Sequence, residues 1–321
     1  MGKKDVKTKK FVQDGKRFAD ICNYFLYGGR QVIKAEDLKE MDATELLASP
    51  EEGLRFEPVQ KIRDVLKTVV VKRAEGTFYM LAGIENQSDV NYAIVVRNML
   101  YDSINYSKQT ANLAKKHRAR KDLKTSAEFL SGMTSEDRLV PVVTITLFWG
   151  AGKWDGARSL HEMFKVADRN VLSCVPDYKI NLIVPDEIED FSTFATDVGC
   201  TLDCIKHSGR KEDLMEFFER NKELFSAIDE ETADVISECV GIKINDEDRK
   251  EGKVNMSRGA QELWEDGVEK GLEQGLEQGL EQGRKETCMT IALALLKEGL
   301  KDSDVARITS LPIEKVKELE G

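Results

Sequence analysis

Two acidic residues stand at the ends of two short β-type runs of this chain. Asp64 precedes the apolar run 65–71. Glu85 follows the run 77–84, which is rich in aromatic and branched residues, and the turn-prone segment 74–76 between the runs predicts a β-hairpin. An antiparallel hairpin brings the start of its first strand beside the end of its second, so we expect the two carboxylates to converge although 21 residues separate them.

A pair of carboxylates at a strand end suits a hard divalent cation. Mg²⁺ takes oxygen ligands and is commonly held by one or two carboxylates together with waters and substrate phosphate oxygens. An ion held in this way polarises a phosphodiester and activates a water for attack. The spacing of the acids therefore predicts phosphodiester hydrolysis.

The sequence around these acids resembles the PD-(D/E)xK nuclease superfamily. Within it, segment 85–88 (ENQS) resembles the recombination-promoting nuclease/putative transposase (Rpn) family, in which Glu-x-Gln followed by Ser replaces the usual Glu-x-Lys. The similarity continues through segments 18–33, 90–106 and 139–154. It covers nearly the whole chain.

The resemblance implies an α/β fold with a PD-(D/E)xK restriction-endonuclease-like core, a mixed central sheet flanked by helices, and a helical C-terminal extension. It also implies that Asp64, Glu85 and the backbone carbonyl of Asn86 hold Mg²⁺ or Mn²⁺. Asp20, on the first helix, is a further metal candidate in this superfamily. For Asp20 a capping or solvent-facing role is the alternative, because nothing in the local sequence fixes its direction.

Gln87 takes the position of the superfamily's catalytic lysine, with Asp64 and Glu85 as its catalytic partners. Glutamine orients a water or a phosphate oxygen only through neutral hydrogen bonds, whereas lysine also brings a positive charge. We therefore expect either slow activity or a charge supplied by Arg97 or Arg63.

Local basic residues are the candidate contacts to DNA phosphates. The net charge of −10 and the pI near 5.1 argue against binding nucleic acid through the overall field of the protein. Arg97 and Tyr101, four residues apart on one helical face, either position phosphates or anchor their helix to the sheet. Lys115, Lys116 and Arg118 form a local cluster that either contacts phosphates or is simply solvated.

The order of elements can also be predicted. Residues 11–34 read as a helix stopped at Gly28, 90–116 as a crossover helix, and 140–149 and 178–184 as strands. Amphipathic helical pieces follow up to about residue 250. The composition is that of a cytoplasmic protein, since no apolar run approaches the roughly 20 residues that a membrane helix needs.

Four segments are expected along the chain. Residues 1–10 read as a disordered basic tail, and 11–250 as the nuclease-like domain. Residues 251–286 contain a four-residue Gly/Glu/Gln repeat, which forms either a self-associating helix or a flexible tether. Residues 287–321 resemble a small helix-turn-helix, for which docking or oligomerisation is favoured over base reading because its second helix is acidic.

Two functions from different classes remain open. The first is a Mg²⁺-dependent endonuclease that cuts double-stranded DNA in the recombination or transposition of mobile elements, as the resemblance implies. The second is a catalytically inactive DNA-binding or self-assembling protein on the same fold. A homo-oligomer formed through the C-terminal helical region is compatible with both.

Overall fold

The structure, a computed structural model, describes residues 2–40, 65–73, 76–165 and 168–319. They form two compact units, divided between Ala260 and Gln261. Asp64 and Arg63 lie outside the described residues, as does the turn at 74–75. Within the described residues, none of the helices combines the length and the apolar composition needed to cross a membrane.

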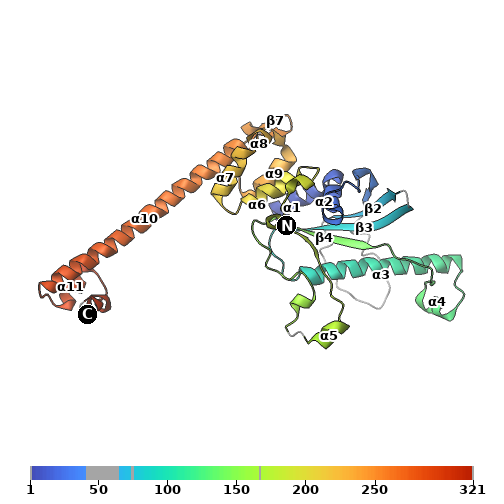
Figure 1. Cartoon of the computed structure of the whole chain (residues 1–321), viewed down its shortest axis with the longest axis horizontal. Coiled ribbons are helices and arrows are strands. Elements are labelled where there is room, and N and C mark those ends of the chain that lie inside the picture. Colours follow the sequence, from blue (N-terminus) through green and yellow to red (C-terminus); the bar gives the residue numbers. More distant parts are fainter. Residues whose placement is uncertain (1, 41–64, 74–75, 166–167, 320–321) are drawn as a thin grey trace. The chain divides into compact units, whose positions relative to one another are not determined.

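The first unit is built on a mixed five-stranded sheet in the order β1-β2-β3-β4-β5, of which Figure 1 labels β2, β3 and β4. β2 is antiparallel to both of its neighbours, whereas β3, β4 and β5 run parallel. The strands are β1 (Leu38–Glu40), β2 (Val65–Arg73), β3 (Gly76–Gln87), β4 (Val142–Phe148) and β5 (Asn181–Ile183). The predicted hairpin is confirmed by the β2–β3 ladder, which begins at the pair Val65 and Ile84.

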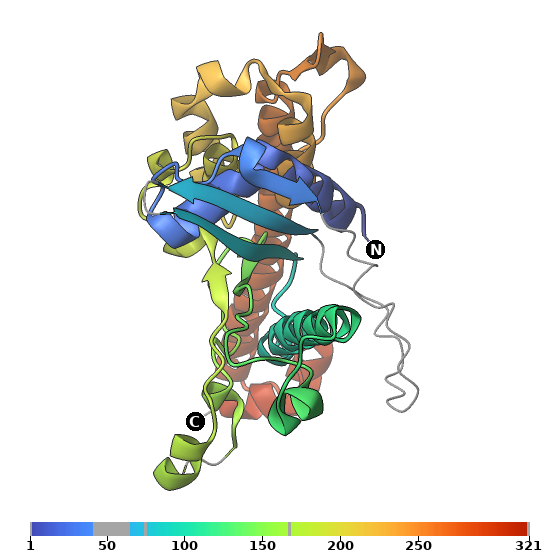
Figure 2. The ribbon, with the colours of Figure 1, turned by 90° about the vertical axis from the view of Figure 1, so that its right-hand side faces the viewer.

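Helices cover both faces of this sheet, as Figure 2 shows. On one face, α1 (Lys3–Gln13), α2 (Gly15–Tyr27), α6 (Val198–His207) and α9 (Glu230–Val240) contribute buried apolar side chains to the main core. On the other face lies the long helix α3 (Ile94–Arg120), the expected crossover between the parallel strands β3 and β4. The fold is therefore mixed α/β, with the central sheet flanked by helices.

The ends of α2 follow from its sequence. The side chain of Asp14 accepts hydrogen bonds from the backbone N–H groups of Lys16 and Arg17, both at 3.0 Å, and so caps the first turn. Gly28 ends the helix with a φ of 60°, a left-handed conformation that glycine adopts without steric cost. The predicted stop at Gly28 is confirmed, but the helix predicted from residue 11 is divided at Asp14, where α1 ends and α2 begins.

The expectation of a disordered tail at 1–10 is wrong, because α1 begins at Lys3. One face of α1 is apolar, and Phe11 and Val12 on it are fully buried in the main core. On its polar face, Lys7 Nζ lies 3.0 Å from Glu238 of α9. The lysines that suggested disorder are thus attracted to an acidic helix more than 200 residues away in the chain.

The first unit also contains shorter elements. A three-stranded sheet in the order β6-β8-β7 lies beside α9. Its strands are β6 (Ile228–Asp229), β7 (Arg249–Lys250) and β8 (Lys253–Val254). The shorter helices are α4 (Ser126–Ser131), α5 (Arg169–Cys174), α7 (Lys211–Arg220) and α8 (Lys222–Phe225).

The second unit consists of most of α10 (Ser257–Lys297), with α11 (Asp302–Thr309) and α12 (Ile313–Glu318). The Gly/Glu/Gln repeat is helical throughout α10. Helices are present at 287–318 as predicted, but the expected boundary between 286 and 287 is wrong because α10 crosses it without a break. Ala292, Val305 and Val316 form the buried core of this end of the chain.

Candidate functional site

A polar layer lies between α3 and the sheet. Side chains alternate between the two faces of a strand, so Ile84 on β3 and Ile145 on β4 point into the main core while Glu85 and Thr146 point toward α3. Gln87, two residues beyond Glu85, shares its face of β3. The predicted pair Glu85 and Gln87 therefore lies on the α3 side of the sheet.

A ladder of side-chain hydrogen bonds fixes α3 to β4. Asn98 Nδ2 donates to Thr146 Oγ1 at 2.9 Å, and Thr144 Oγ1 donates to a carboxylate oxygen of Asp102 at 2.6 Å. Tyr178 donates its hydroxyl to the other oxygen of Asp102 at 2.7 Å. One helical turn rises about 5.4 Å and two strand residues span about 6.6 Å. Because these lengths are similar, residues one turn apart on α3 can bond to alternate residues of β4. The ladder sets the position of α3 above Glu85.

Glu85 is 6% exposed and contacts Arg97 of α3, whose Nη2 lies 2.7 Å from its Oε1. Among the described residues, Nε of Arg97 is buried without a hydrogen-bond partner. The sequence left open whether Arg97 anchors the helix or provides charge. The structure shows that it contacts the candidate catalytic acid and that its donors are not all used by the described residues.

The segment after Glu85 is fixed from the opposite face of the sheet. The fully buried Trp149 donates its indole N–H to Oδ1 of Asn86 at 2.7 Å and its backbone N–H to the carbonyl of Gln87 at 2.8 Å. Lys4 of α1 in turn donates to the carbonyl of Trp149 at 2.8 Å. The carbonyl of Asn86, an expected metal ligand, accepts a hydrogen bond from the side-chain amide of Gln87 at 2.6 Å.

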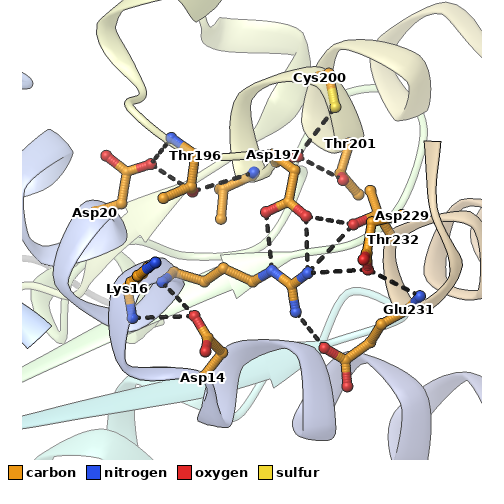
Figure 3. A network of polar contacts seen from close by, with 12 residues as sticks. Asp14, Lys16, Asp20, Thr196, Asp197, Cys200, Thr201, Asp229, Glu231 and Thr232 are labelled. Atoms are coloured by element: carbon orange, nitrogen blue, oxygen red, sulfur yellow. Dashed lines mark hydrogen bonds and ion pairs between the residues drawn. The ribbon is translucent and has the colours of Figure 1, made fainter. Parts of the chain in front are cut away.

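Asp20 does not lie in this layer, and the structure gives it a different role. It is 1% exposed and accepts a hydrogen bond from the backbone N–H of Ala195 at 3.0 Å. It also accepts from the backbone N–H of Thr196 at 2.8 Å and from the Thr196 hydroxyl at 2.6 Å (Figure 3). These bonds hold the loop before α6 against α2, on the main-core face of the sheet. Asp20 is therefore neither a helix cap nor solvent-facing, and its carboxylate anchors this loop.

The expected phosphate contacts divide into two groups. Tyr101 is 7% exposed, so its burial favours anchoring of α3 over contact with DNA. Lys115, Lys116 and Arg118 are exposed near the end of α3. Of the expected phosphate contacts, these three are exposed, whereas Arg97, with 27% of its side chain exposed, is only partly accessible.

Lys108, which the sequence did not single out, is shielded from solvent at its Nζ, and burial lowers the pKa of this amine. It lies eleven residues after Arg97 on the same side of α3, about 16 Å along the helix axis. That distance is too long for Lys108 to replace the missing lysine at Gln87.

Sequence reasoning also missed Asn98, Asp102 and Tyr178. A signal was present: Thr144 and Thr146 are alternate polar residues in an otherwise apolar strand, and they mark the face that needs polar partners. Within the described part of the chain, no group of three His, Cys, Asp or Glu residues is arranged to hold a metal ion. Glu85 is the described member of the predicted acid pair.

Comparison with known proteins places the chain in a family. Residues 51–235, more than half of the chain, match the family described as "Putative transposase, YhgA-like". The chain belongs to this family, and the resemblance to the Rpn group is thereby confirmed. No curated protein and no solved structure matched it. The family description connects the protein with transposition and recombination.

Proposed function

We propose that the protein is a metal-dependent, cytoplasmic endonuclease that hydrolyses phosphodiester bonds of double-stranded DNA. The observation that carries this proposal is the buried carboxylate of Glu85 at a strand end, next to the guanidinium of Arg97 and two residues before Gln87. The family membership supports a role on mobile DNA.

The donor atoms at this position suit Mg²⁺ or Mn²⁺ in kind, since carboxylate and carbonyl oxygens are their usual ligands. Glu85 and the carbonyl of Asn86 would hold the ion together with Asp64, which directly precedes Val65 in the chain. Val65 pairs with Ile84, the residue before Glu85. When bound, the ion would polarise the phosphodiester and activate a water.

The chain's own residues would supply orientation and charge. Gln87 would orient the attacking water or a phosphate oxygen by neutral hydrogen bonds. Arg97, held next to Glu85, would supply the positive charge that a lysine brings in related sites. The ladder from α3 to β4 would keep Arg97 in register with Glu85.

The test is nicking of supercoiled plasmid in Mg²⁺ and in Mn²⁺. Wild-type protein is compared with Asp64→Asn, Glu85→Gln and a matched control, Glu187→Gln, which removes the carboxylate of an exposed pair with Arg158. We expect both site variants to lose activity at least about 100-fold while the control keeps it. Equal nicking by all four proteins would contradict the proposal.

Absence of nicking by any of the four proteins, with DNA still bound, would favour the inactive DNA-binding protein instead.

A specific observation also supports self-assembly. Leu272, Leu276 and Leu280 are 72, 63 and 66% exposed on α10. Interior glycines of this helix each cost roughly 1 kcal/mol relative to alanine, so the repeat gains from a partner.

We propose that these leucines join α10 to a second copy of the chain. The measurement is the molar mass by light scattering of wild-type protein, of the triple variant L272Q/L276Q/L280Q, and of Leu224→Gln, which changes an exposed leucine of α8. We expect a dimer or larger species that only the triple variant dissociates. A monomeric wild type would overturn the proposal.

A further inference from the structure

The last turns of α3 extend past the start of the strand that anchors this helix. The side-chain amide of Gln109 accepts from the N–H of Val140 at 2.7 Å and donates to its carbonyl at 3.0 Å, two residues before β4 begins. α3 then continues for eleven residues, about 16 Å, to Arg120. We call residues 110–138, which include these turns and α4, the basic arm; Figure 1 shows α4 near the far end of α3.

The basic arm is held in one shape by polar contacts and close packing. His117 lies between two carboxylates, with Nδ1 2.7 Å from Asp122 and Nε2 3.0 Å from Asp137. Glu128 and Thr125 form a capping box at the start of α4. Gly132 has a φ of 70°, and a Cβ at this position would come within 2.5 Å of Ala114. The loop is therefore packed against α3.

The charge of the basic arm is opposite to that of the protein. It carries seven Lys or Arg residues and four Asp or Glu residues, a net charge of +3 in a chain of net charge −10. Three of its four acids are engaged inside the arm: Asp122 and Asp137 contact His117, and Glu128 caps α4. The cations Lys115, Lys116, Arg118, Arg120, Lys121, Lys124 and Arg138 are exposed.

Two adjacent large apolar side chains are exposed on α4. Phe129 is 67% exposed and Leu130 is 91% exposed, the highest value among the exposed large apolar residues of the described chain. Exposure of two adjacent large apolar side chains to water is unfavourable, and such a patch often marks a binding surface. Many minor-groove binding proteins insert apolar side chains between adjacent base pairs, which unstacks the bases and bends the duplex. Neighbouring cations of such proteins contact the phosphates.

We propose that the basic arm is a DNA-binding element in which the lysines and arginines contact phosphates while Phe129 and Leu130 insert into the minor groove and bend the duplex. The inference rests on the proposed function for its choice of ligand. It assigns to the basic arm the bending of bound DNA, a role that the candidate catalytic residues do not have. Duplex DNA is the ligand that suits the basic arm, because the exposed side chains of the arm are mainly cationic. Three of the four acids of the arm are bound to His117 or to the start of α4.

The experiment uses the full-length chain carrying Glu85→Gln in the absence of divalent metal, so that binding is measured apart from cleavage. Binding to an end-labelled duplex of about 30 base pairs is followed by anisotropy, and bending by energy transfer between the two ends. The tip variant is F129S/L130S, and the charge variant is K115Q/K116Q/R118Q. The matched control is Val171→Ser, since Val171 is 61% exposed on the short helix α5.

We expect the tip variant to lose the bend and about tenfold in affinity with an unchanged salt dependence. The charge variant should keep the bend at saturation, while the slope of log affinity against log salt falls by up to about 3. The control should behave as the parent protein. Circular dichroism verifies that each variant is folded like the Glu85→Gln parent, which is expected because the side chains changed in the tip, charge and control variants are exposed.

Three results would overturn the proposal. The first is unchanged bending and affinity in the tip variant. The second is absence of DNA binding by the parent chain. The third is tip-dependent binding to anionic lipid vesicles without any tip effect on DNA, which would assign the arm to a membrane surface. Plasmid nicking by the protein with Glu85 intact is scored separately, so the nuclease proposal stands or fails independently.

Discussion

Arg17 and Arg97 each pair with a carboxylate in the first unit, but their surroundings differ. Arg17 donates through Nε and Nη2 to both oxygens of Asp197 at 2.8 and 2.7 Å and also donates to Glu231 and Thr232. Its guanidinium lies 4.0 Å from the ring centroid of Phe11. Figure 3 shows this network of acids and hydroxyls joining α2, α6 and α9.

Arg97 contacts Glu85 at 2.7 Å through one nitrogen, and its side chain is 27% exposed compared with 10% for Arg17. Four of the five N–H donors of Arg17 are engaged by protein groups, which leaves little of this guanidinium for a ligand. An arginine with donors to spare can accept a phosphate. The comparison therefore separates a structural ion cluster from a candidate functional one.

The strongest test of this comparison is Arg17→Lys. An ammonium cannot reproduce the planar contact with Asp197, so at least two charge-assisted hydrogen bonds are lost. At about 1.5–3 kcal/mol each, we expect the free energy of unfolding measured in urea to fall by about 3 kcal/mol. A loss as small as that of Arg158→Lys, in an exposed pair with Glu187, would contradict the structural role.

Asp20→Asn tests the second buried carboxylate on the main-core face. The amide keeps one acceptor oxygen but loses the acceptor for one of the N–H or O–H groups of segment 195–196. We expect unfolding free energy to fall by about 1–3 kcal/mol. At temperatures where the variant is folded, nicking should match wild type. A selective loss of nicking with unchanged stability would return Asp20 to the metal site.

Replacement by lysine should lower the free energy of unfolding much less at Arg97 than at Arg17. Lysine can replace the single contact to Glu85, so we expect Arg97→Lys to lose less than about 1 kcal/mol of unfolding free energy. Nicking should nevertheless fall about tenfold, because the ammonium cannot bind a phosphate in the bidentate way. A stability loss equal to that of Arg17→Lys would abolish the distinction between the two clusters.

A third cluster, His117 with Asp122 and Asp137, is near the surface and should give the smallest effect. Hydrogen bonds to Asp122 and then to Asp137 raise the pKa of His117, with burial opposing them. A raised folded pKa means that the stabilisation is complete below the ordinary value of about 6.5 and is lost as pH rises through the folded pKa.

Hydrogen exchange of residues 110–138 at pH 6 and at pH 8.5 measures this dependence. We expect slower exchange, after correction for the intrinsic rates, at the lower pH. His117→Gln should remove the difference. Equal protection of the wild-type arm at both pH values would show that the cluster does not titrate in this range.

Much of the fold follows from local sequence. The two β-type runs at 65–71 and 77–84 and the turn-prone segment between them predicted the hairpin, and its register places Val65 opposite Ile84 as expected. Gly28 ends α2 because few other residues adopt its positive φ without cost. These features depend on residues that are neighbours in the chain, so a single sequence contains the information for them.

The roles of single polar residues depended on contacts between distant parts of the chain. The sequence left Asp20 open between a metal ligand and a capping or solvent-facing residue, whereas in the structure its carboxylate accepts from the N–H groups of segment 195–196. Lys7 suggested disorder until α9 brought Glu238 within 3.0 Å. The same holds for Asp102, whose partners Thr144 and Tyr178 lie 42 and 76 residues further on.

The sequence by itself determined the hairpin and its register, the crossover helix and the position of Glu85 and Gln87 near a strand end, because strand and helix periodicity are properties of short segments. Only the tertiary structure decided that Arg97 lies against Glu85 and that Asp20 and Arg17 belong to the core. The physical reason is that burial and pairing set what a charged side chain can do, and both arise when distant segments pack together.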